Sequence, residues 1–266
     1  MNKQKNAPIG VFDSGLGGIS VLRELKALMP NEQFLYFGDD QNAPYGGRSE
    51  EEVLTLTRDG VKRLLDYDCK AVVLACNTAT AAAIVPLRKE MPNCILVGAE
   101  PAIKPAVRDG YRKIGVLATA TTLASGRFHA LAKSVGAEAE ILPIPAPGLV
   151  ELIEERIWSG PVLEAFLEKL LVKPLSLGID AIVLGCTHYP FVSDAIRKVS
   201  GGLPLYDGNR GIAQQTHRLL AELDWLNEGD EQMMGKEKVV FLRQGQDAGF
   251  FELAGTLLTQ TLGEET

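Results

Sequence analysis

The chain has few cysteines and no long apolar run, and both absences narrow its class. Four cysteines in 266 residues, without the close spacing of small secreted domains, do not form a disulfide framework, so we expect free thiols in a cytoplasmic protein. Cys69 and Cys94 are expected to be small, half-buried thiols. No apolar run approaches the roughly 18 residues of a transmembrane helix, and the polar residues 1–8 do not resemble a signal peptide. We therefore expect no membrane partner.

Signatures of nucleic-acid and nucleotide binding are also missing. A net charge of −7 without a basic cluster argues against nucleic acid as a partner. The glycine-rich segment 13–18 follows an apolar run, but Ser20 stands where the dinucleotide fingerprint requires glycine, and no Walker lysine is present. Lys70 and Lys104 lie in ordinary strand and helix sequence, which gives no sign of a pyridoxal site. We expect a protein that acts on a small molecule without a cofactor.

One pattern of strand and cysteine occurs twice. Residues 71–78 read Ala-Val-Val-Leu-Ala-Cys-Asn-Thr, and residues 181–188 read Ala-Ile-Val-Leu-Gly-Cys-Thr-His. Each apolar run is typical of a strand buried on both faces of a parallel sheet. Cys76 and Cys186 follow the carboxyl ends of these strands, where open α/β sheets bind their ligands. The two thiols are therefore candidate site residues that can face each other across one crevice.

Strand-like and helix-like stretches alternate along most of the chain. The segments 9–12 and 114–117, Ile-Gly-Val-Phe and Ile-Gly-Val-Leu, are matching strand openers. Such alternation is typical of βαβ units and parallel sheets. The expected strands are 9–12, 34–37, 71–75, 95–98, 114–118, 140–144, 181–184 and 203–206. The expected helices lie around 19–28, 50–66, 78–90, 123–135 and 191–199, with more than one helix between 149 and 172.

The duplication predicts an α/β fold of two pseudo-symmetric, doubly wound domains, with the active site in the cleft between them. The last region contains a helix at 210–226, a charged loop at 228–238, one strand at 239–242 and a final helix. Because one strand cannot form a sheet alone, this region must dock on one of the halves.

Cys186 and His188, two residues apart, form the other informative cluster. Such a pair is compatible with a nucleophile and its base, with a zinc site completed by Cys76, or with acid–base chemistry. A hydrolase needs a third group to orient the histidine, and zinc needs three or four ligands. Acid–base chemistry alone gives each copy of the cysteine loop its own role, because one thiol can add a proton to a carbon while the other removes one from the opposite face. We therefore favour proton transfer, with no metal.

Four motifs together resemble a known family. Asp13-Ser14-Gly15, Pro44-Tyr45-Gly46, Ala75-Cys76-Asn77-Thr78 and Leu184-Gly185-Cys186-Thr187-His188 are similar, in order and spacing, to the glutamate racemases of bacterial cell-wall synthesis. The resemblance covers residues 9–206, and the segment 241–258 is similar to that family's C-terminal strand and helix. The paired cysteine motifs are specific to the cofactor-independent amino-acid racemases, and the Pro-Tyr-Gly turn and the chain length favour glutamate over aspartate.

The resemblance implies interconversion of L- and D-glutamate by two bases, which supplies D-glutamate for peptidoglycan. Cys76 would remove the α-proton of D-glutamate with Asp13 as its helper, and Cys186 that of L-glutamate with His188 as its helper. Glu154 matches an acid that assists the second base. The resemblance also implies two domains, a first of residues 1–103 with 208–266, to which the C-terminal segment returns, and a second of residues 104–207. Its implied partners are a second copy of the chain in a homodimer and a cell-wall precursor that activates the enzyme. The implied substrate contacts are Asp13, Ser14, Pro44, Tyr45, Gly46, Asn77, Thr78, Thr119, Thr122, Thr187 and His188.

Two positions depart from the family. Asn42 replaces an arginine common before the Pro-Tyr-Gly turn, and Phe128 replaces a common tyrosine. Glu151, where many relatives carry proline, is an alternative to Glu154 as the assisting acid. The alternative functions are racemisation of aspartate or another acidic amino acid, a two-domain binding protein with the same cleft, and a cysteine hydrolase of amino-acid derivatives.

The reaction itself requires one thiolate and one thiol. The α-hydrogen of an amino acid is a very weak acid, so placed donors must stabilise a carbanion-like transition state. Helix N-termini after Ser14, Asn77 and Thr187 suit the substrate carboxylates. Since a helix N-terminus or a histidinium partner lowers the pKa of a thiol, we expect one of Cys76 and Cys186 to be a thiolate in any given complex.

Overall fold

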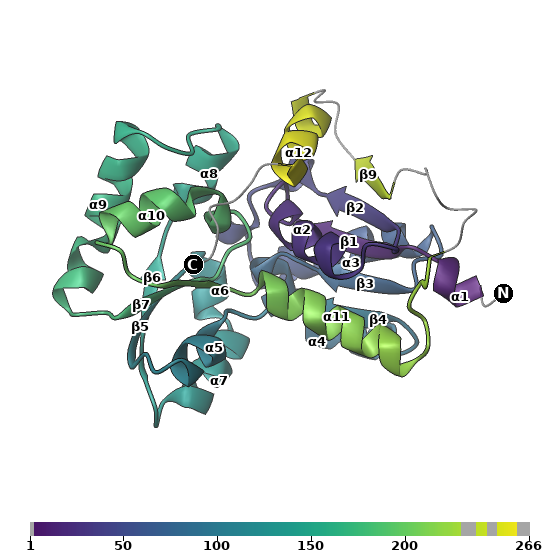
Figure 1. Cartoon of the computed structure of the whole chain (residues 1–266), viewed down its shortest axis with the longest axis horizontal. Helices are drawn as coiled ribbons and strands as arrows, with labels where there is room; N and C mark the ends of the chain where they lie inside the picture. Colours follow the sequence, from purple (N-terminus) through teal and green to yellow (C-terminus); the bar gives the residue numbers. More distant parts are fainter. Residues whose placement is uncertain (1–2, 230–237, 244–248, 260–266) are drawn as a thin grey trace.

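The computed structural model describes residues 3–229, 238–243 and 249–259 of the chain. Its strands form two parallel sheets, one of five strands and one of four, which lie side by side in Figure 1 with helices packed around each. The expected α/β class with two mainly parallel sheets is thereby confirmed. The strands are β1 (Ile9–Asp13), β2 (Phe34–Gly38), β3 (Ala71–Leu74), β4 (Ile95–Gly98), β5 (Lys113–Ala118), β6 (Glu140–Pro145), β7 (Ala181–Leu184), β8 (Leu205–Asp207) and β9 (Val239–Arg243).

The two sheets share one strand order. The first runs β4-β3-β1-β2-β9 and the second β6-β5-β7-β8. If the second is read from its other end, β8-β7-β5-β6 matches β4-β3-β1-β2 strand for strand. Every pair of neighbouring strands is parallel. The repeat seen in the sequence is therefore also a repeat of topology.

Helices and 3-10 turns connect the strands. Ser49 shows how one of them begins: its Oγ accepts a hydrogen bond from the Glu52 N–H (3.3 Å), and the Glu52 carboxylate accepts one from the Ser49 N–H (2.9 Å). The helices are α1 (Lys3–Asn6), α2 (Ile19–Leu28), α3 (Glu50–Leu65), α4 (Asn77–Glu90), α5 (Ile103–Arg108), α6 (Ala120–Ala124), α7 (Gly126–Val135), α8 (Leu149–Glu154), α9 (Pro161–Ser176), α10 (Ser193–Val199), α11 (Asn209–Glu222) and α12 (Gly249–Thr259), and the 3-10 turns are η1 (Asp40–Asn42), η2 (Tyr45–Gly47) and η3 (Tyr189–Val192).

Two expected helices are wrong in their extent. The single helix expected at 123–135 is two helices, α6 and α7, because Ser125 ends the first and caps the second by accepting a hydrogen bond from the Phe128 N–H (3.1 Å). The helix expected at 191–199 begins as the 3-10 turn η3, with Pro190 in its first turn, and becomes α-helical at Ser193. The other bounds differ from the expected ones by a few residues, as is usual for element ends.

The C-terminal region lies against the first sheet. Strand β9 pairs with β2, from Phe34 opposite Val239 to Gly38 opposite Arg243. Helices α11 and α12 both contact α2, which belongs to the same half of the chain. Residues 230–237 of the expected charged loop are outside the described part of the chain.

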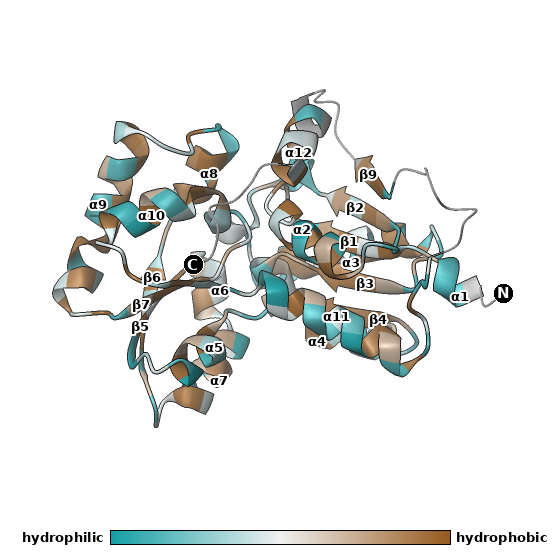
Figure 2. Cartoon of the chain, in the orientation of Figure 1, coloured by the Kyte–Doolittle hydropathy of each residue, from teal (hydrophilic) through white to brown (hydrophobic). Residues whose placement is uncertain are grey.

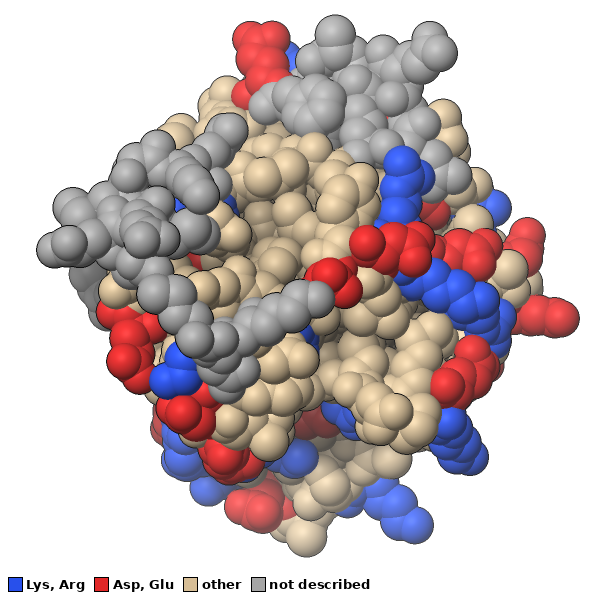
Figure 3. Space-filling view, turned by 90° about the vertical axis from the view of Figure 1, so that its right-hand side faces the viewer, with Lys and Arg blue, Asp and Glu red and all other residues tan. Residues whose placement is uncertain are grey.

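Apolar residues concentrate on the strands, whose ribbons are mostly brown in Figure 2. The largest fully buried side chains include Phe12, Phe34 and Tyr36. On the face in Figure 3, acidic and basic side chains are interspersed around a broad uncharged area. Among the described residues, no helix combines the length and apolar character that a membrane crossing requires.

A buried ion pair joins three segments at the amino ends of the strands of the first sheet. Lys70, before β3, places Nζ 2.6 Å from Glu32 Oε2, and the two side chains are 0% and 2% exposed. Nζ also donates to the carbonyl oxygens of Lys5 (3.0 Å) and Trp225 (2.8 Å), and Glu32 Oε1 accepts from the Asn227 N–H (2.9 Å). Burial lowers the pKa of Lys70, and the contact with Glu32 only partly offsets this. The pair holds α1 and the segment after α11 to the first sheet.

Candidate active site

One pocket of about 140 Å³ lies between the two sheets. It is formed where the carboxyl ends of β1, β3, β5 and β7 approach one another. Strands β1 and β3, like β5 and β7, are the neighbours at which the strand order reverses, and open α/β sheets bind ligands at such points. The walls are Ser14, Pro44, Tyr45, Gly46, Gly47, Cys76, Asn77, Thr78, Thr119, Ala120, Ala146, Pro147, Gly148, Val150, Glu151, Cys186, Thr187 and His188.

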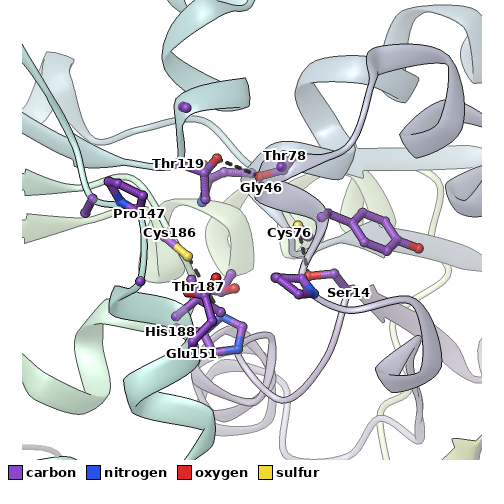
Figure 4. A pocket seen from close by; sticks show the side chains of 18 residues that line it. Ser14, Gly46, Cys76, Thr78, Thr119, Pro147, Glu151, Cys186, Thr187 and His188 are labelled. Atoms are coloured by element: carbon purple, nitrogen blue, oxygen red, sulfur yellow. Dashed lines mark hydrogen bonds between the residues drawn. The ribbon is translucent and has the colours of Figure 1, made fainter.

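The two thiols occupy equivalent places on the pocket wall. Cys76 follows β3 and Cys186 follows β7, and Figure 4 shows their sulfur atoms on opposite sides of the pocket. Both side chains are buried, at 6% and 9% exposed, and both are free thiols. A ligand in this pocket therefore has one sulfur atom on each side.

Cys76 is the N-cap residue of α4. Its Sγ accepts a hydrogen bond from the Ala79 N–H (3.4 Å) and lies 3.5 Å from Ser14 Oγ. Burial raises the pKa of Cys76 to about 12, and the negative charge of Asp13 adds to this. The hydrogen bonds from Ser14 and from the Ala79 N–H at the helix N-terminus lower this pKa, but loss of water contact outweighs them. Cys76 is therefore a thiol in this structure, and its thiolate would be a strong base.

Cys186 has a different partner, the ring of His188. The distance from Cys186 Sγ to His188 Nδ1 is 3.8 Å, and His188 Nε2 lies 2.7 Å from Glu154 Oε1 on α8. Burial lowers the pKa of His188, but the contacts with Cys186 and Glu154 outweigh it and raise that pKa well above its usual value. Burial also opposes a charged Glu154, yet the bond to His188 lowers the pKa of the carboxyl. The arrangement favours an imidazolium between a sulfur and a carboxylate.

Gly17 allows this ring to lie where it does. A Cβ at position 17 would collide with Thr187 Oγ1 and with the ring of His188. The glycine-rich segment after β1 therefore allows the two halves to approach closely, because it leaves room for the side chains of Thr187 and His188 after β7.

Asp13 is fully buried behind the pocket wall. Its Oδ1 accepts from the Gly15 N–H (3.0 Å), and its Oδ2 accepts from Thr187 Oγ1 (3.1 Å). Burial raises the pKa of Asp13, although His188 and these hydrogen bonds act in the opposite direction. Ser20 Oγ donates to the Thr187 carbonyl oxygen (2.9 Å). Thr187 is thus bonded twice to the opposite half of the molecule.

A loop after β2 closes another side of the pocket. Tyr45 donates its hydroxyl to Asp39 Oδ2 (2.6 Å), and Asn42 donates its amide to both oxygens of the same carboxylate (3.0 and 3.1 Å). The peptide bond between Ala43 and Pro44 is cis. Asn42, one of the two departures from the family, therefore helps to fix the turn that carries Tyr45 and Gly46.

Three threonines join the two halves beside this loop. Thr78 Oγ1, at the start of α4, lies 2.9 Å from Thr119 Oγ1 and 3.2 Å from Thr122 Oγ1, and the last two oxygens are 2.9 Å apart. Thr121 Oγ1 donates to the Gly46 carbonyl oxygen (2.7 Å). The hydroxyls of Thr78 and Thr119 face the pocket together, whereas Thr122 lies behind them.

The structure brings most of the sequence-predicted residues to the pocket wall and leaves three behind it. Asp13, Thr122 and Glu154 are not wall residues, but each is hydrogen-bonded to a residue that is. Glu151, the alternative acid, lies on the wall itself. The wall residues outside the predicted set are Gly47, Ala120, Ala146, Pro147, Gly148, Val150 and Glu151, and three of them belong to the Pro-Ala-Pro-Gly sequence at 145–148.

The zinc alternative has no geometric support in the described part of the chain. Within residues 3–229, 238–243 and 249–259, no three His, Cys, Asp or Glu side chains converge in a way that could hold a metal ion.

A duplicated α/β fold with a thiol at each point of strand-order reversal has the architecture of an amino-acid racemase. The chain belongs to the Asp/Glu/hydantoin racemase family, whose profile matches residues 17–216. Comparison with individual relatives narrows the assignment within this family to the glutamate racemases. It is 44% identical to the glutamate racemase of Clostridium acetobutylicum over 96% of this chain and 98% of that one. The family resemblance drawn from the motifs is thereby confirmed.

Solved structures agree with this assignment. The glutamate racemase of Francisella tularensis, in complex with D-glutamate, superposes with a TM-score of 0.85 at 28% identity, over 97% of this chain and 96% of that one. The Escherichia coli glutamate racemase, in complex with L-glutamate and the activator UDP-MurNAc-Ala, gives a TM-score of 0.80 at 29% identity over 94% of each chain.

Proposed function

We propose that this protein interconverts L-glutamate and D-glutamate without a cofactor. The observation that carries the proposal is the pair of buried thiols, Cys76 and Cys186, on opposite sides of one pocket and at equivalent ends of two duplicated halves. The curated relative from Clostridium acetobutylicum and the Francisella tularensis complex with D-glutamate support glutamate as the substrate. A pocket of about 140 Å³ suits one small amino acid.

The proposed reaction moves two protons between two sulfur atoms and one carbon. With D-glutamate bound, the Cys76 thiolate removes the α-proton from one face, and the Cys186 thiol donates its proton to the opposite face. L-Glutamate is released, and Cys76 is left as a thiol and Cys186 as a thiolate. The reverse reaction uses the same groups with exchanged roles. General acid–base steps of this kind each contribute roughly 10²- to 10⁴-fold in rate.

Different neighbours assist the two sulfur atoms. Burial and Asp13 raise the pKa of Cys76 to about 12, so its thiolate binds the α-proton strongly. His188, held by Glu154, offers a positive charge to the Cys186 thiolate. Asp13 and His188 are thus the proposed helpers, and Glu154 keeps the ring of His188 in place.

Polar groups around the pocket are suited to the substrate's carboxylates and amino group. The N-terminus of α4 at Asn77 and Thr78 offers backbone N–H groups to an anion. Preorganised donors of this kind stabilise the negative charge that develops as the α-proton leaves. The proposed substrate contacts on the wall are Ser14, Pro44, Tyr45, Gly46, Asn77, Thr78, Thr119, Thr187 and His188, with Asp13 and Thr122 acting from behind it.

The cellular role follows from the proposed product. D-Glutamate would supply peptidoglycan synthesis in the cytoplasm. The activator in the Escherichia coli structure supports a cell-wall precursor as a regulator, and a homodimer remains our expectation from the family. We also propose the division into residues 1–103 with 208–266 and residues 104–207, which the pairing of β9 with β2 supports.

The test is the circular dichroism of L-glutamate incubated with purified protein and no added cofactor. The signal is expected to decay to zero as the racemate forms, and D-glutamate is expected to decay to the same end point. L-Aspartate serves as the competing substrate. Decay with aspartate and none with glutamate would reassign the substrate, and decay with neither would refute racemisation.

A further inference from the structure

A tyrosine hydroxyl beside the second thiol is buried without a partner. Tyr189 opens η3 three residues after Cys186, and its backbone N–H donates to the Cys186 carbonyl oxygen (3.2 Å). Its side chain is 0% exposed and belongs to the same apolar cluster as Cys186. Among the described residues, no group stands in hydrogen-bonding geometry with its hydroxyl. Because buried hydroxyls nearly always have a hydrogen-bond partner, the lack of one here requires an explanation.

Two ionisable side chains lie close enough to the hydroxyl to affect its pKa. They are Cys186 and Glu151, the latter from α8. Burial raises the pKa of Tyr189 well above its usual value, and the negative charges of these two groups and a contact with Cys186 raise it further, so the hydroxyl stays protonated and can donate to an anion. Glu151 is exposed and can be hydrated, whereas Cys186 is 9% exposed. Water can therefore hydrogen-bond to the Glu151 carboxylate, whereas the Cys186 sulfur depends on protein groups for its hydrogen bonds.

The two thiols are unequally supplied with hydrogen-bond donors. Cys76 Sγ has the Ala79 N–H at 3.4 Å and Ser14 Oγ at 3.5 Å. For Cys186 Sγ the described residues provide His188 Nδ1, at the longer distance of 3.8 Å. A buried thiolate needs more than one such donor, because charged groups out of water are stable only when hydrogen-bonded.

We propose that Tyr189 is a positioning residue whose hydroxyl donates a hydrogen bond to Cys186 Sγ when that sulfur is a thiolate. The inference rests on the proposed function, in which Cys186 removes the α-proton of L-glutamate. A neutral thiol is a weak acceptor and a thiolate a strong one, so the bond forms as the sulfur gains charge. The hydroxyl thus stabilises one protonation state over the other, without touching the substrate.

Removal of this hydroxyl leaves every other ionisable side chain near Cys186 in the protein, so a change in the titration of Cys186 can be assigned to the hydroxyl. They come from the loop after β7, from α8, from β1 and from the start of α4, and they are His188, Glu154, Glu151, Asp13 and Cys76.

The test is Tyr189→Phe in the full-length protein, with alkylation of each cysteine by iodoacetamide followed by mass spectrometry across a pH series. The midpoint pH for Cys186 is expected to rise by about one unit, the value of a hydrogen bond to a charged group, and that for Cys76 to stay unchanged. The matched control is Tyr206→Phe, which removes an exposed hydroxyl that donates to Asp109 Oδ2 (2.9 Å), and neither midpoint is expected to move.

Two further readouts separate this role from simple packing. Tyr189→3-fluorotyrosine, with a more acidic and stronger donor, is expected to lower the Cys186 midpoint. Below the midpoint, Tyr189→Phe is expected to reduce kcat/KM about tenfold with both enantiomers alike, since the two have equal free energies. An unchanged Cys186 midpoint in a folded Tyr189→Phe protein, or equal shifts at both cysteines, overturns the inference. Failure of the wild-type protein to racemise glutamate would overturn the proposed function, while the alkylation midpoints would still decide the hydrogen bond.

Discussion

Glu154 Oε1 lies 2.7 Å from His188 Nε2, the ring nitrogen opposite the one that faces Cys186. One carboxylate thereby fixes both the orientation and the charge of the ring. Because the contacts with Cys186 and Glu154 raise the pKa of His188 against the effect of burial, the imidazolium persists to a pH at which a free histidine is neutral.

Glu154→Gln is expected to lower the pKa of His188 by about one unit or more, because an opposite charge in contact shifts a pKa by roughly 1 to 3 units. The basic limb of the kcat/KM profile would then move to lower pH. The measurement is racemisation rate against pH, with Glu155→Gln, an exposed neighbour, as the control. An unmoved basic limb would show that the carboxylate does not set the charge of the ring.

The same pair also predicts how stability depends on pH. The folded-state pKa of His188 is raised, so its contribution is fully present below the ordinary histidine pKa and is lost as the pH rises through the raised value. In Glu154→Gln this loss is expected to be smaller and to be complete at lower pH. Urea midpoints at several pH values measure it, and parallel curves for the two proteins would contradict it.

Each cysteine can be tested separately by hydrogen exchange in heavy water. Cys76→Ala is expected to lose racemisation by about 10³-fold or more, because one of two acid–base groups is missing, but to exchange the α-hydrogen of L-glutamate through Cys186. Cys186→Ala is expected to exchange D-glutamate alone. Proton NMR of each enantiomer reads the exchange, and Cys94→Ala, away from the pocket, is the control. Racemisation at the wild-type rate in Cys76→Ala would falsify the two-base mechanism.

Gly17→Ala tests the close approach of the two halves. The added Cβ would collide with Thr187 Oγ1 and the ring of His188, so the ring must shift from its place between Cys186 and Glu154. A displacement of this size is expected to reduce kcat by about 10²-fold. Gly211→Ala in α11, where a Cβ would meet no atom within 4 Å, is the matched control. Equal activity of the two variants would show that the ring tolerates displacement.

Lys70→Met is expected to destabilise the fold by about 3–5 kcal/mol, because it leaves the buried charge of Glu32 unpaired. The double variant Lys70→Met with Glu32→Gln removes that charge and retains an acceptor for the Asn227 N–H. It is expected to recover about 2 kcal/mol. Urea unfolding measures both. No recovery in the double variant would mean that the lost bonds to the Lys5 and Trp225 carbonyl oxygens account for the whole effect.

The sequence predicts the sheets well because their signal is local. Apolar runs such as 71–74 and 181–184 are buried on both faces, and the cysteine after each run lies at the carboxyl end that forms the pocket. The sequence also indicates the repeat of topology, because the strand openers at 9 and 114 precede Cys76 and Cys186 by similar numbers of residues.

What the sequence could not provide are contacts between distant segments. Nothing local to Thr187 indicates that its hydroxyl reaches Asp13, or that Ser20 holds its carbonyl oxygen. The split at Ser125 was missed because a serine in a helical pattern is read as an ordinary polar residue, whereas here it caps α7. The choice between Glu151 and Glu154 depends on how α8 lies against His188, which no spacing rule determines.

Strand β9 has a consequence for synthesis of the protein. The edge of β2 finds its neighbour only when residues 239–243 have left the ribosome, after every strand of the other sheet. Before β9 is synthesised, the second sheet can be complete while the backbone N–H and C=O groups on one edge of β2 have no partner strand. Such an edge can pair with a strand of another chain and cause aggregation. A chain shortened from its C-terminal side so that β9 is lost would keep this edge of β2 unpaired after synthesis, even though every residue of the pocket would still be present.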